Sequence, residues 1–323
     1  MPNLMLTNWC NYKCPYCFGI DFMHPLLPKK NMSMDTFHGI IDWLSITKRD
    51  VSTIHLMGGE PTLHPNFEEI VSELLSKDFH ITVFSNLATP KAPEYAQKLS
   101  DLPIEWVVNV NPPSGWSNEQ SERIRSALKV LKNKACITFN IMPDSDDNNW
   151  AVDLINQYGL NHSMKIGFVL PTMTGSNFSL EEEQYPVVAE KVVNLARVCE
   201  PYHIHFEFEC GVPTCAFTEE QLGYLWEVGS KFDSSCNSRL DISPDGECIY
   251  CLPLAKLAAV HYTNFLNYFD AKMWFEKKIL PYRRLGRIEN CHKCVLFKTS
   301  CRGGCVAKMV LGAKNVKTND NER

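Results

Sequence analysis

The chain has 323 residues, of which 45% are hydrophobic and 21% charged, and its formal net charge is −5. This composition is typical of a globular protein, and the length predicts one large domain or two. The acidic balance argues against a nucleic-acid partner, and no apolar run approaches the roughly 20 residues of a membrane-spanning helix, which argues against a membrane partner. Fourteen cysteines without a signal peptide favour a cytoplasmic protein whose reduced thiols bind metal rather than form disulfides.

Strands and helices alternate over the first two hundred residues. Runs rich in Val, Ile and Phe predict six strands, at Asn3–Thr7, Val51–Met57, His80–Phe84, Ile104–Val110, Ala135–Met142 and Met164–Leu170. Helical patterns lie between and after them, at Ser33–Ser45, Asn66–Ser76, Pro93–Leu99, Glu119–Leu131, Asn148–Tyr158 and Leu180–Cys199. Six consecutive βα units predict a parallel sheet with right-handed crossovers, but they do not distinguish an open sheet from a partial barrel.

Three cysteines with the spacing CxxxCxxC follow the first predicted strand, at Cys10, Cys14 and Cys17. A structural zinc site and a 4Fe–4S cluster each take four protein ligands. Three ligands on one loop therefore leave one iron of a cluster open, and an open coordination position is what a reaction needs. The alternative is a zinc site whose fourth ligand comes from elsewhere in the chain.

Two adjacent glycines end the second predicted strand, in the sequence MGGEP that begins at Met57. Glycine lets the backbone approach a ligand closely, because it has no Cβ. The alternative is an ordinary turn between a strand and a helix. Polar residues also end later strands, among them Ser85 and Asn140, where they would either bind a ligand or form turns.

The composition changes after residue 200, since the chain from Cys210 onward holds nine of the fourteen cysteines. We place a domain boundary there, which predicts domains at 1–200 and 201–323. The run HIHFEFEC at 203–210 alternates polar and apolar residues and predicts a half-buried strand. Its polar face is expected to be solvated, with a metal site as the alternative.

A turn signal at Ser243–Gly246 predicts a hairpin that brings Cys236 and Cys251 together. Four more cysteines follow with short spacings, at Cys291, Cys294, Cys301 and Cys305. Such pairs serve either iron–sulfur clusters or structural zinc sites of four cysteines each.

The CxxxCxxC loop, with Tyr16 before its last cysteine, and the GGE motif resemble the signature of the radical S-adenosylmethionine (SAM) enzymes. In that family the open iron binds the amino and carboxylate groups of SAM, and reductive cleavage yields a 5′-deoxyadenosyl radical that abstracts a substrate hydrogen. The resemblance implies an α/β fold, a (β/α)6 partial TIM barrel with both motifs at the C-terminal ends of strands. The implied contacts are a 4Fe–4S cluster on Cys10, Cys14 and Cys17, SAM on Gly58, Gly59 and Glu60, adenine on Tyr16, and ribose or the SAM carboxylate on Ser85 and Asn140.

The later cysteines resemble the SPASM domain, a small C-terminal extension that carries auxiliary 4Fe–4S clusters in radical SAM enzymes. That family has five residues between two of the cysteines where this chain has six, between Cys294 and Cys301. The resemblance implies one or two auxiliary clusters. The first would use Cys236, Cys251 and Cys305, with Cys215 as the fourth ligand and Cys210 in reserve, and the second would use Cys291, Cys294 and Cys301.

The fourth ligand of the second cluster stays open, because no cysteine follows Cys305 where the family has its last one. An oxygen ligand such as Asp320 would complete the cluster, or Cys248 would do so. The remaining alternatives are an open iron and the absence of a second cluster.

The two resemblances imply a radical SAM enzyme that oxidises or cross-links a ribosomally made peptide, with an electron donor such as flavodoxin or ferredoxin. An alternative with the same cofactors is the oxidation of a small molecule, such as an aminocyclitol or a sugar alcohol. Sulfatase-maturing relatives have an Asp after the second cysteine of the first auxiliary motif. This chain has Leu252 there, which argues against a sulfatase-maturing enzyme. A third alternative, from another class, is a non-catalytic zinc-binding interaction module.

Overall fold

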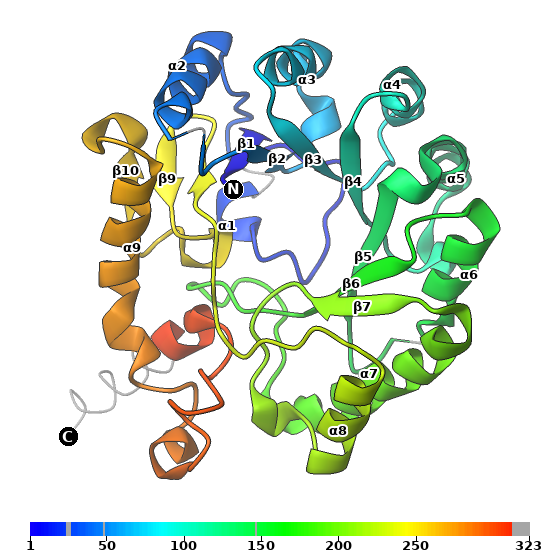
Figure 1. Cartoon of the computed structure of the whole chain (residues 1–323), viewed down its shortest axis with the longest axis vertical. Coiled ribbons are helices and arrows are strands. Elements are labelled where there is room, and N and C mark those ends of the chain that lie inside the picture. Colours follow the sequence, from blue (N-terminus) through cyan, green and yellow to red (C-terminus); the bar gives the residue numbers. More distant parts are fainter. Residues whose placement is uncertain (24–26, 48, 146, 312–323) are drawn as a thin grey trace.

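A ten-stranded sheet curves around the centre of the molecule, with helices α2 to α8 around its outside (Figure 1). The computed structural model describes residues 1–23, 27–47, 49–145 and 147–311. The strand order is β10-β9-β8-β1-β2-β3-β4-β5-β6-β7. Strands β1 to β7 all run parallel, and β8 continues this part of the sheet. The seven are β1 (Asn3–Thr7), β2 (Thr53–Gly58), β3 (His80–Ser85), β4 (Ile104–Asn109), β5 (Ala135–Ile141), β6 (Ser163–Phe168) and β7 (His205–Phe208).

The predicted α/β fold and its six βα units are confirmed, since every predicted strand before residue 200 matches one of β1 to β6. The helices are α1 (Ile20–Met23), α2 (Met34–Ser45), α3 (Phe67–Ser76), α4 (Ala92–Leu99), α5 (Asn118–Leu131), α6 (Asn149–Tyr158), α7 (Tyr185–Cys199), α8 (Glu219–Glu227) and α9 (Tyr268–Arg283). Ser33 caps α2 and a Ser117–Gln120 capping box begins α5, as helix-start signals predict. Among the described residues, no helix is both long and apolar enough to cross a bilayer.

Residues from beyond position 200 extend the sheet at both ends. β7 joins β6 as a seventh parallel strand. At the other end, β8 (Asp241–Ile242) pairs parallel with β1. β9 (Glu247–Ile249) then pairs antiparallel with β8, and β10 (Ala259–His261) pairs antiparallel with β9. The predicted hairpin is therefore present, and its turn closes with a 2.9 Å hydrogen bond from the Gly246 amide to the Ser243 carbonyl. β7 and β10 are the two edges of the sheet, so the barrel formed by the described residues is partial and open.

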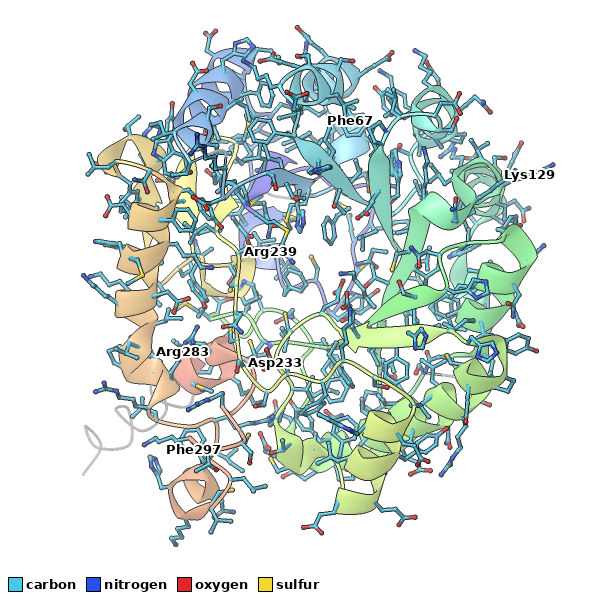
Figure 2. All side chains as sticks on the ribbon, in the orientation of Figure 1. Phe67, Lys129, Asp233, Arg239, Arg283 and Phe297 are labelled. Carbon is cyan, nitrogen blue, oxygen red and sulfur yellow. The ribbon has the colours of Figure 1, made fainter. Side chains whose placement is uncertain are left out.

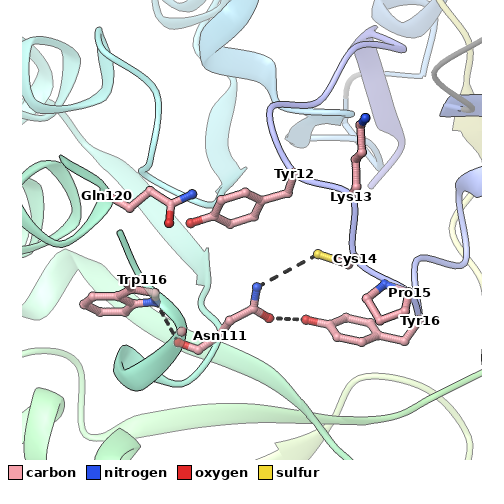
Figure 3. Close-up of a pocket in the computed structure, with 9 residues that line it drawn as sticks. Tyr12, Lys13, Cys14, Pro15, Tyr16, Asn111, Trp116 and Gln120 are labelled. Carbon is pink, nitrogen blue, oxygen red and sulfur yellow. Dashed lines mark hydrogen bonds between the residues drawn. The ribbon is translucent and has the colours of Figure 1, made fainter. Parts of the chain in front are cut away.

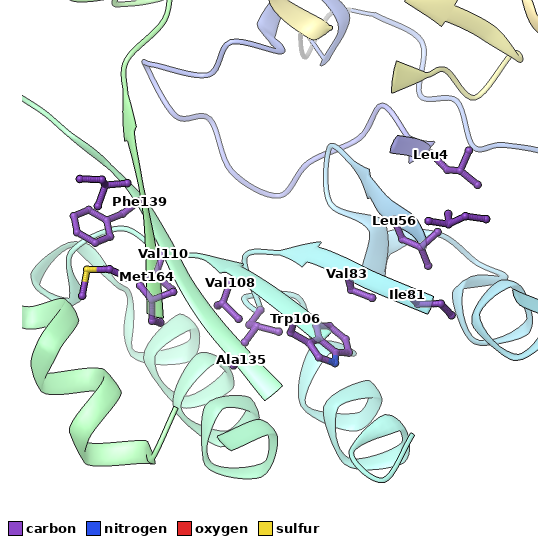
Figure 4. Packing of buried hydrophobic residues seen from close by; sticks show 14 of the residues in the cluster. Leu4, Leu56, Ile81, Val83, Trp106, Val108, Val110, Ala135, Phe139 and Met164 are labelled. Atoms are coloured by element: carbon purple, nitrogen blue, oxygen red, sulfur yellow. The ribbon is translucent and has the colours of Figure 1, made fainter. Parts of the chain in front are cut away.

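The hydrophobic core lies between the outer face of the sheet and the helices (Figure 4). Successive side chains of a strand point to opposite faces, so Ile81 and Val83 of β3 face the helices while Thr82 faces the barrel interior. On β5 the same alternation buries Ile137 and Phe139 in the core. Burial of such side chains contributes about 2 kcal/mol each. The inner face is consequently free to carry polar side chains, and it positions the candidate site.

Candidate active site

The cysteine loop leaves β1 at its C-terminal end and crosses the mouth of the barrel. All three thiols are half-buried, and the backbone amide of Tyr12 donates to the Cys10 sulfur at 3.4 Å. The pKa of Cys10 is raised to about 12, chiefly by burial and in addition by the Glu60 carboxylate, Cys14 and Cys17, while the hydrogen bond from Tyr12 opposes the rise. Three thiols that repel each other's negative charge fit a cationic iron centre, which offsets that repulsion.

The two glycines of the GGE motif let the end of β2 pair with the chain that leads into the cysteine loop. The Gly59 amide donates to the Thr7 carbonyl and the Glu60 amide to the Trp9 carbonyl, both at 2.8 Å. A Cβ on Gly59 would lie 2.1 Å from the Trp9 carbonyl oxygen, and Gly58 adopts a φ of +144°. The structure thus shows why both positions are glycine, while their contact with SAM stays a prediction.

The Glu60 side chain is 1% exposed and lies beneath the loop. Its carboxylate accepts hydrogen bonds from the Thr62 amide at 3.2 Å, the Thr62 hydroxyl at 2.7 Å, the Ser85 hydroxyl at 2.8 Å and the Asn86 amide at 2.8 Å. Burial raises the pKa of this carboxyl, and the four donors oppose that rise. Glu60 therefore joins the ends of β2 and β3, and the Ser85 hydroxyl, predicted to bind SAM, is engaged with it.

Asn86 connects this buried network to the cysteine loop. Its side-chain amide donates to the Asn11 side-chain oxygen at 2.9 Å and lies 3.9 Å from the Cys10 sulfur. The loop that carries the three thiols is therefore held from β2 through its backbone and from β3 through Asn86.

A cavity of about 300 Å³ opens beside the loop (Figure 3). The Tyr16 hydroxyl donates to the Asn111 side-chain oxygen, whose amide nitrogen lies 4.0 Å from the Cys14 sulfur. The Trp116 indole donates to the Asn111 carbonyl at 2.9 Å. The cavity is lined by Tyr12, Lys13, Cys14, Pro15, Tyr16, Asn111, Gly115, Trp116 and Gln120. Trp116 lies in the β4–α5 connection and Gln120 in the first turn of α5, and no motif marks either of them as a ligand-binding residue.

Polar residues of β5 and β7 meet on the inner face of the barrel. The Thr138 hydroxyl donates to the Glu209 carboxylate at 2.7 Å, and a Cβ on Gly167 would lie 2.3 Å from the Asn140 side-chain oxygen and 3.7 Å from the Glu209 carboxylate. Glu207 pairs with Lys165 across the same face at 2.8 Å. This polar face lies on the inner side of the barrel, where side chains point towards the centre of the molecule (Figure 2). The expectation that it is solvated agrees with the exposure of His205 and Glu209, while Glu207 is half-buried. Alternation alone does not say which face of a strand is inner.

Four C-terminal thiols form one group: Cys210, Cys236, Cys251 and Cys305. Burial raises the pKa of Cys210 well above its usual value, and the Cys305 and Cys236 thiols raise it further. The Cys251 pKa is raised in the same way, by burial and then by Cys236, Asp241, Cys305 and Cys210. The Cys210 side chain is exposed all the same. We call this set the Cys210 group.

Two other thiols, Cys291 and Cys301, lie near Cys215, and Cys294 follows Cys291 closely in the chain. We call Cys215, Cys291, Cys294 and Cys301 the Cys215 group. Burial raises the pKa of Cys215, and of its neighbours Arg287 lowers this pKa while Cys301 and Cys291 raise it. The Cys294 amide donates to the Cys291 carbonyl at 3.3 Å. The structure thus places Cys215 near Cys291 and Cys301. Cys210, the alternative fourth ligand of the first cluster, lies with Cys236, Cys251 and Cys305.

Cys248 and Asp320 were the other residues considered as the fourth ligand of the second cluster. Cys248 is 0% exposed in the hydrophobic core, where burial raises its pKa to about 12. Asp320 lies outside the described residues. Over the described ranges, no three His, Cys, Asp or Glu side chains converge closely enough to hold a single metal ion.

Comparisons with known proteins agree with this geometry. The sequence matches the Radical SAM superfamily over residues 4–115. It is 31% identical over 270 residues to the GTP 3′,8-cyclase of Mannheimia succiniciproducens, with 77% of this chain and 76% of that protein covered. It is 24% identical over 263 residues to the radical SAM cyclopropyl synthase TigE of Paramaledivibacter caminithermalis, with 68% and 54% covered. The chain spans less than two thirds of the first curated relatives that it matches.

The fold is also shared with solved structures. SuiB of Streptococcus suis bound to S-adenosylmethionine superposes with a TM-score of 0.68, at 13% identity, over 95% of this chain and 72% of that one. SuiB bound to its precursor peptide SuiA superposes with a TM-score of 0.63, at 11% identity, over 95% and 70%. The motifs, the fold and these relatives agree: the chain belongs to the radical SAM superfamily, and its cofactors are a 4Fe–4S cluster and SAM.

Proposed function

We propose that the chain is a radical SAM enzyme that oxidises or cross-links a ribosomally made peptide. The observation that carries this proposal is the presence of two groups of four thiols in the C-terminal region, in addition to the three thiols of the barrel loop. Four cysteines are the usual ligand set of a 4Fe–4S cluster. Oxidation or cross-linking removes hydrogens from a substrate and leaves electrons to be accepted, which is the role proposed for auxiliary clusters.

The residues of the barrel would divide the work as follows. Cys10, Cys14 and Cys17 hold the cluster that, with SAM, supplies the radical chemistry. Glu60 and Asn86 hold the cysteine loop in place, and the cavity beside Tyr16 and Asn111 is proposed to receive the adenosyl part of SAM. Stacking on an aromatic ring and hydrogen bonds from a side-chain amide are suited to an adenine.

The inner face of the barrel is proposed to contact the substrate. Thr138 and Glu209 are hydrogen-bonded there, and Asn140 lies beside Gly167. The close approach at Gly167 leaves no room for a side chain, so Asn140 keeps its place on this face. A carboxylate and an amide at the C-terminal ends of barrel strands are suited to hold peptide backbone groups.

The choice of a peptide is supported by the relatives. SuiB is known with its precursor peptide SuiA bound, and its fold covers nearly the whole of this chain. A second candidate is a small molecule, because the GTP 3′,8-cyclase is the relative with the higher identity over a comparable length. The two candidates predict different products from the same cofactors.

The test uses the whole chain, reconstituted with iron and sulfide without oxygen and reduced by dithionite or by flavodoxin. Short peptides encoded beside the gene are incubated with protein and SAM in one set of reactions, and GTP in another. We expect 5′-deoxyadenosine and a peptide whose mass has fallen by two hydrogens, and neither from a Cys10→Ala/Cys14→Ala/Cys17→Ala variant. Conversion of GTP with unchanged peptides would contradict the peptide proposal and favour the small molecule.

A further inference from the structure

Two short segments of the C-terminal region each carry two cysteines, and each segment divides its pair between the two thiol groups. In the first segment, Cys210 belongs to the Cys210 group and Cys215 to the Cys215 group. In the second, Cys305 lies with the former group and Cys301 with the latter. The two groups are therefore adjacent and joined twice by the chain.

The two segments also touch each other. A Cβ on Gly304 would lie 3.0 Å from the Gly211 carbonyl oxygen and 2.9 Å from a Pro213 ring carbon. A Cβ on Gly211 would lie 2.5 Å from the Ser235 carbonyl oxygen, next to Cys236. These contacts lie between Cys210 and Cys215, and backbone atoms cannot move aside cheaply. The contacts fix the backbone between the two thiols, so each thiol keeps its own set of neighbours.

A buried cation lies between the groups. Arg287 is 6% exposed, donates to Glu182 at 2.6 Å and lies over the Tyr185 ring at 4.2 Å. Its positive charge lowers the pKa of both Cys215 and Cys305, so it is close to one thiol of each group. Its Nε is buried and has no acceptor among the described residues. A buried donor without a partner is costly, and it fits a site whose anionic sulfur is supplied by a bound group.

We propose that Cys215 is the fourth ligand of a second auxiliary 4Fe–4S cluster, with Cys291, Cys294 and Cys301, and that Cys210 completes the first. This inference rests on the proposed function and adds to it the ligands of each auxiliary cluster. The ligand that a downstream cysteine would supply comes here from an upstream segment, so the second site needs nothing beyond Cys305. All four ligands are then cysteines, and no oxygen ligand or open iron is required.

The test counts iron and sulfide and records EPR spectra of the whole chain in the Cys10→Ala/Cys14→Ala/Cys17→Ala background, which removes the SAM cluster. We expect about eight irons in this background, which correspond to two clusters. Adding Cys215→Ala should lower the count towards about four, with loss of the EPR signal of one cluster. Adding Cys291→Ala to Cys215→Ala should remove no further cluster, whereas adding Cys305→Ala should remove the other one.

Cys136→Ala is the matched control, because Cys136 is half-buried on β5, outside both groups, where its thiol lies beside the Ser163 carbonyl. Cys215→Ser is the conservative variant, and it should keep a cluster with an altered reduction potential. The proposal is overturned if Cys215→Ala keeps the iron count and spectrum of Cys136→Ala, or if its loss adds to that of Cys291→Ala. Zinc or no iron in the triple-alanine background would instead overturn the auxiliary clusters themselves.

Discussion

The backbone amide of Asn86 donates a 2.8 Å hydrogen bond to the Glu60 carboxylate, and this bond joins the ends of β2 and β3 beneath the cysteine loop. Because Asn86 also contacts the loop through its side chain, the buried carboxylate and the thiols belong to one connected structure. Glu60, the acidic residue of the GGE motif, thus holds the loop in place through Asn86 and does not line the cavity.

Glu60→Gln should destabilise the protein. The side-chain NH2 group of glutamine would face hydrogen-bond donors that now bond a carboxylate oxygen of Glu60. We expect this to lower the free energy of unfolding by about 2 kcal/mol. Chemical denaturation checks this, with Glu68→Gln as the control, since the Glu68 side chain is 49% exposed and pairs with Lys98. Equal stability of the two variants would contradict the proposed role of the buried network.

Gly59→Ala should remove the SAM cluster and spare the C-terminal sites. The new Cβ would meet the Trp9 carbonyl at 2.1 Å, and this backbone atom leads directly into Cys10. We expect about four irons fewer per chain after anaerobic reconstitution. Gly223→Ala is the control, because a Cβ at that position on α8 meets nothing within 4 Å. An unchanged iron content in Gly59→Ala would show that the loop tolerates displacement.

Tyr16→Phe should weaken SAM binding without loss of the cluster. The substitution removes only the hydroxyl that donates to Asn111 and so leaves the Asn111 side chain less well fixed beside the cavity. A loss of about 1.4 kcal/mol in SAM binding would raise the dissociation constant about tenfold. Equilibrium binding of SAM to the reconstituted protein measures this. Tyr158→Phe removes a hydroxyl that accepts from Arg125 on the outer helices, and it should bind SAM as the wild type does.

Arg287→Met should lower the reduction potentials of the auxiliary clusters. A positive charge beside a cluster favours its reduced, more negative state, so its removal disfavours reduction. EPR-monitored redox titration of the triple-alanine background measures the shift. Arg197→Met on α7, where Arg197 lies over the Tyr224 ring, is the control and should leave both potentials in place. Identical potentials in Arg287→Met would place the cation away from the clusters.

His55→Gln should make the protein less sensitive to acid. Burial, Arg239, the N-terminal amine and Lys165 lower the pKa of His55 to about 3, against 6.5 for an ordinary histidine. Between these two pH values the unfolded chain binds more protons than the folded chain. The free energy of unfolding therefore decreases as the pH falls below about 6.5. At pH 5 the loss is about 2 kcal/mol.

The measurement for His55 compares denaturation midpoints of wild type and His55→Gln at pH 7.5 and pH 5. The variant should lose less stability than the wild type between the two values. Parallel losses would mean that His55 becomes protonated without cost in the folded protein, contrary to its burial beside Arg239 at 3.2 Å.

Features that depend on neighbouring residues followed from the sequence alone. The alternation of strand and helix patterns predicted β1 to β6 and their parallel order, because each βα unit is a local pattern with a fixed handedness of connection. The hairpin between Cys236 and Cys251 followed from the turn at Ser243–Gly246 for the same reason. The spacing of the barrel thiols likewise predicted the cluster loop, since one short segment carries all three.

The division of the other thiols was decided by the tertiary structure. Cys210 and Cys215 are close in sequence and lie in an irregular segment, so no periodicity says which way each side chain points. Gly211 and Pro213 pack against Gly304, which is far away in the chain, and that contact fixes the backbone between the two thiols. The inner face of β7 and the cavity at Asn111 were also settled only by folding. In each case the direction of a side chain depends on long-range packing, which local sequence does not contain.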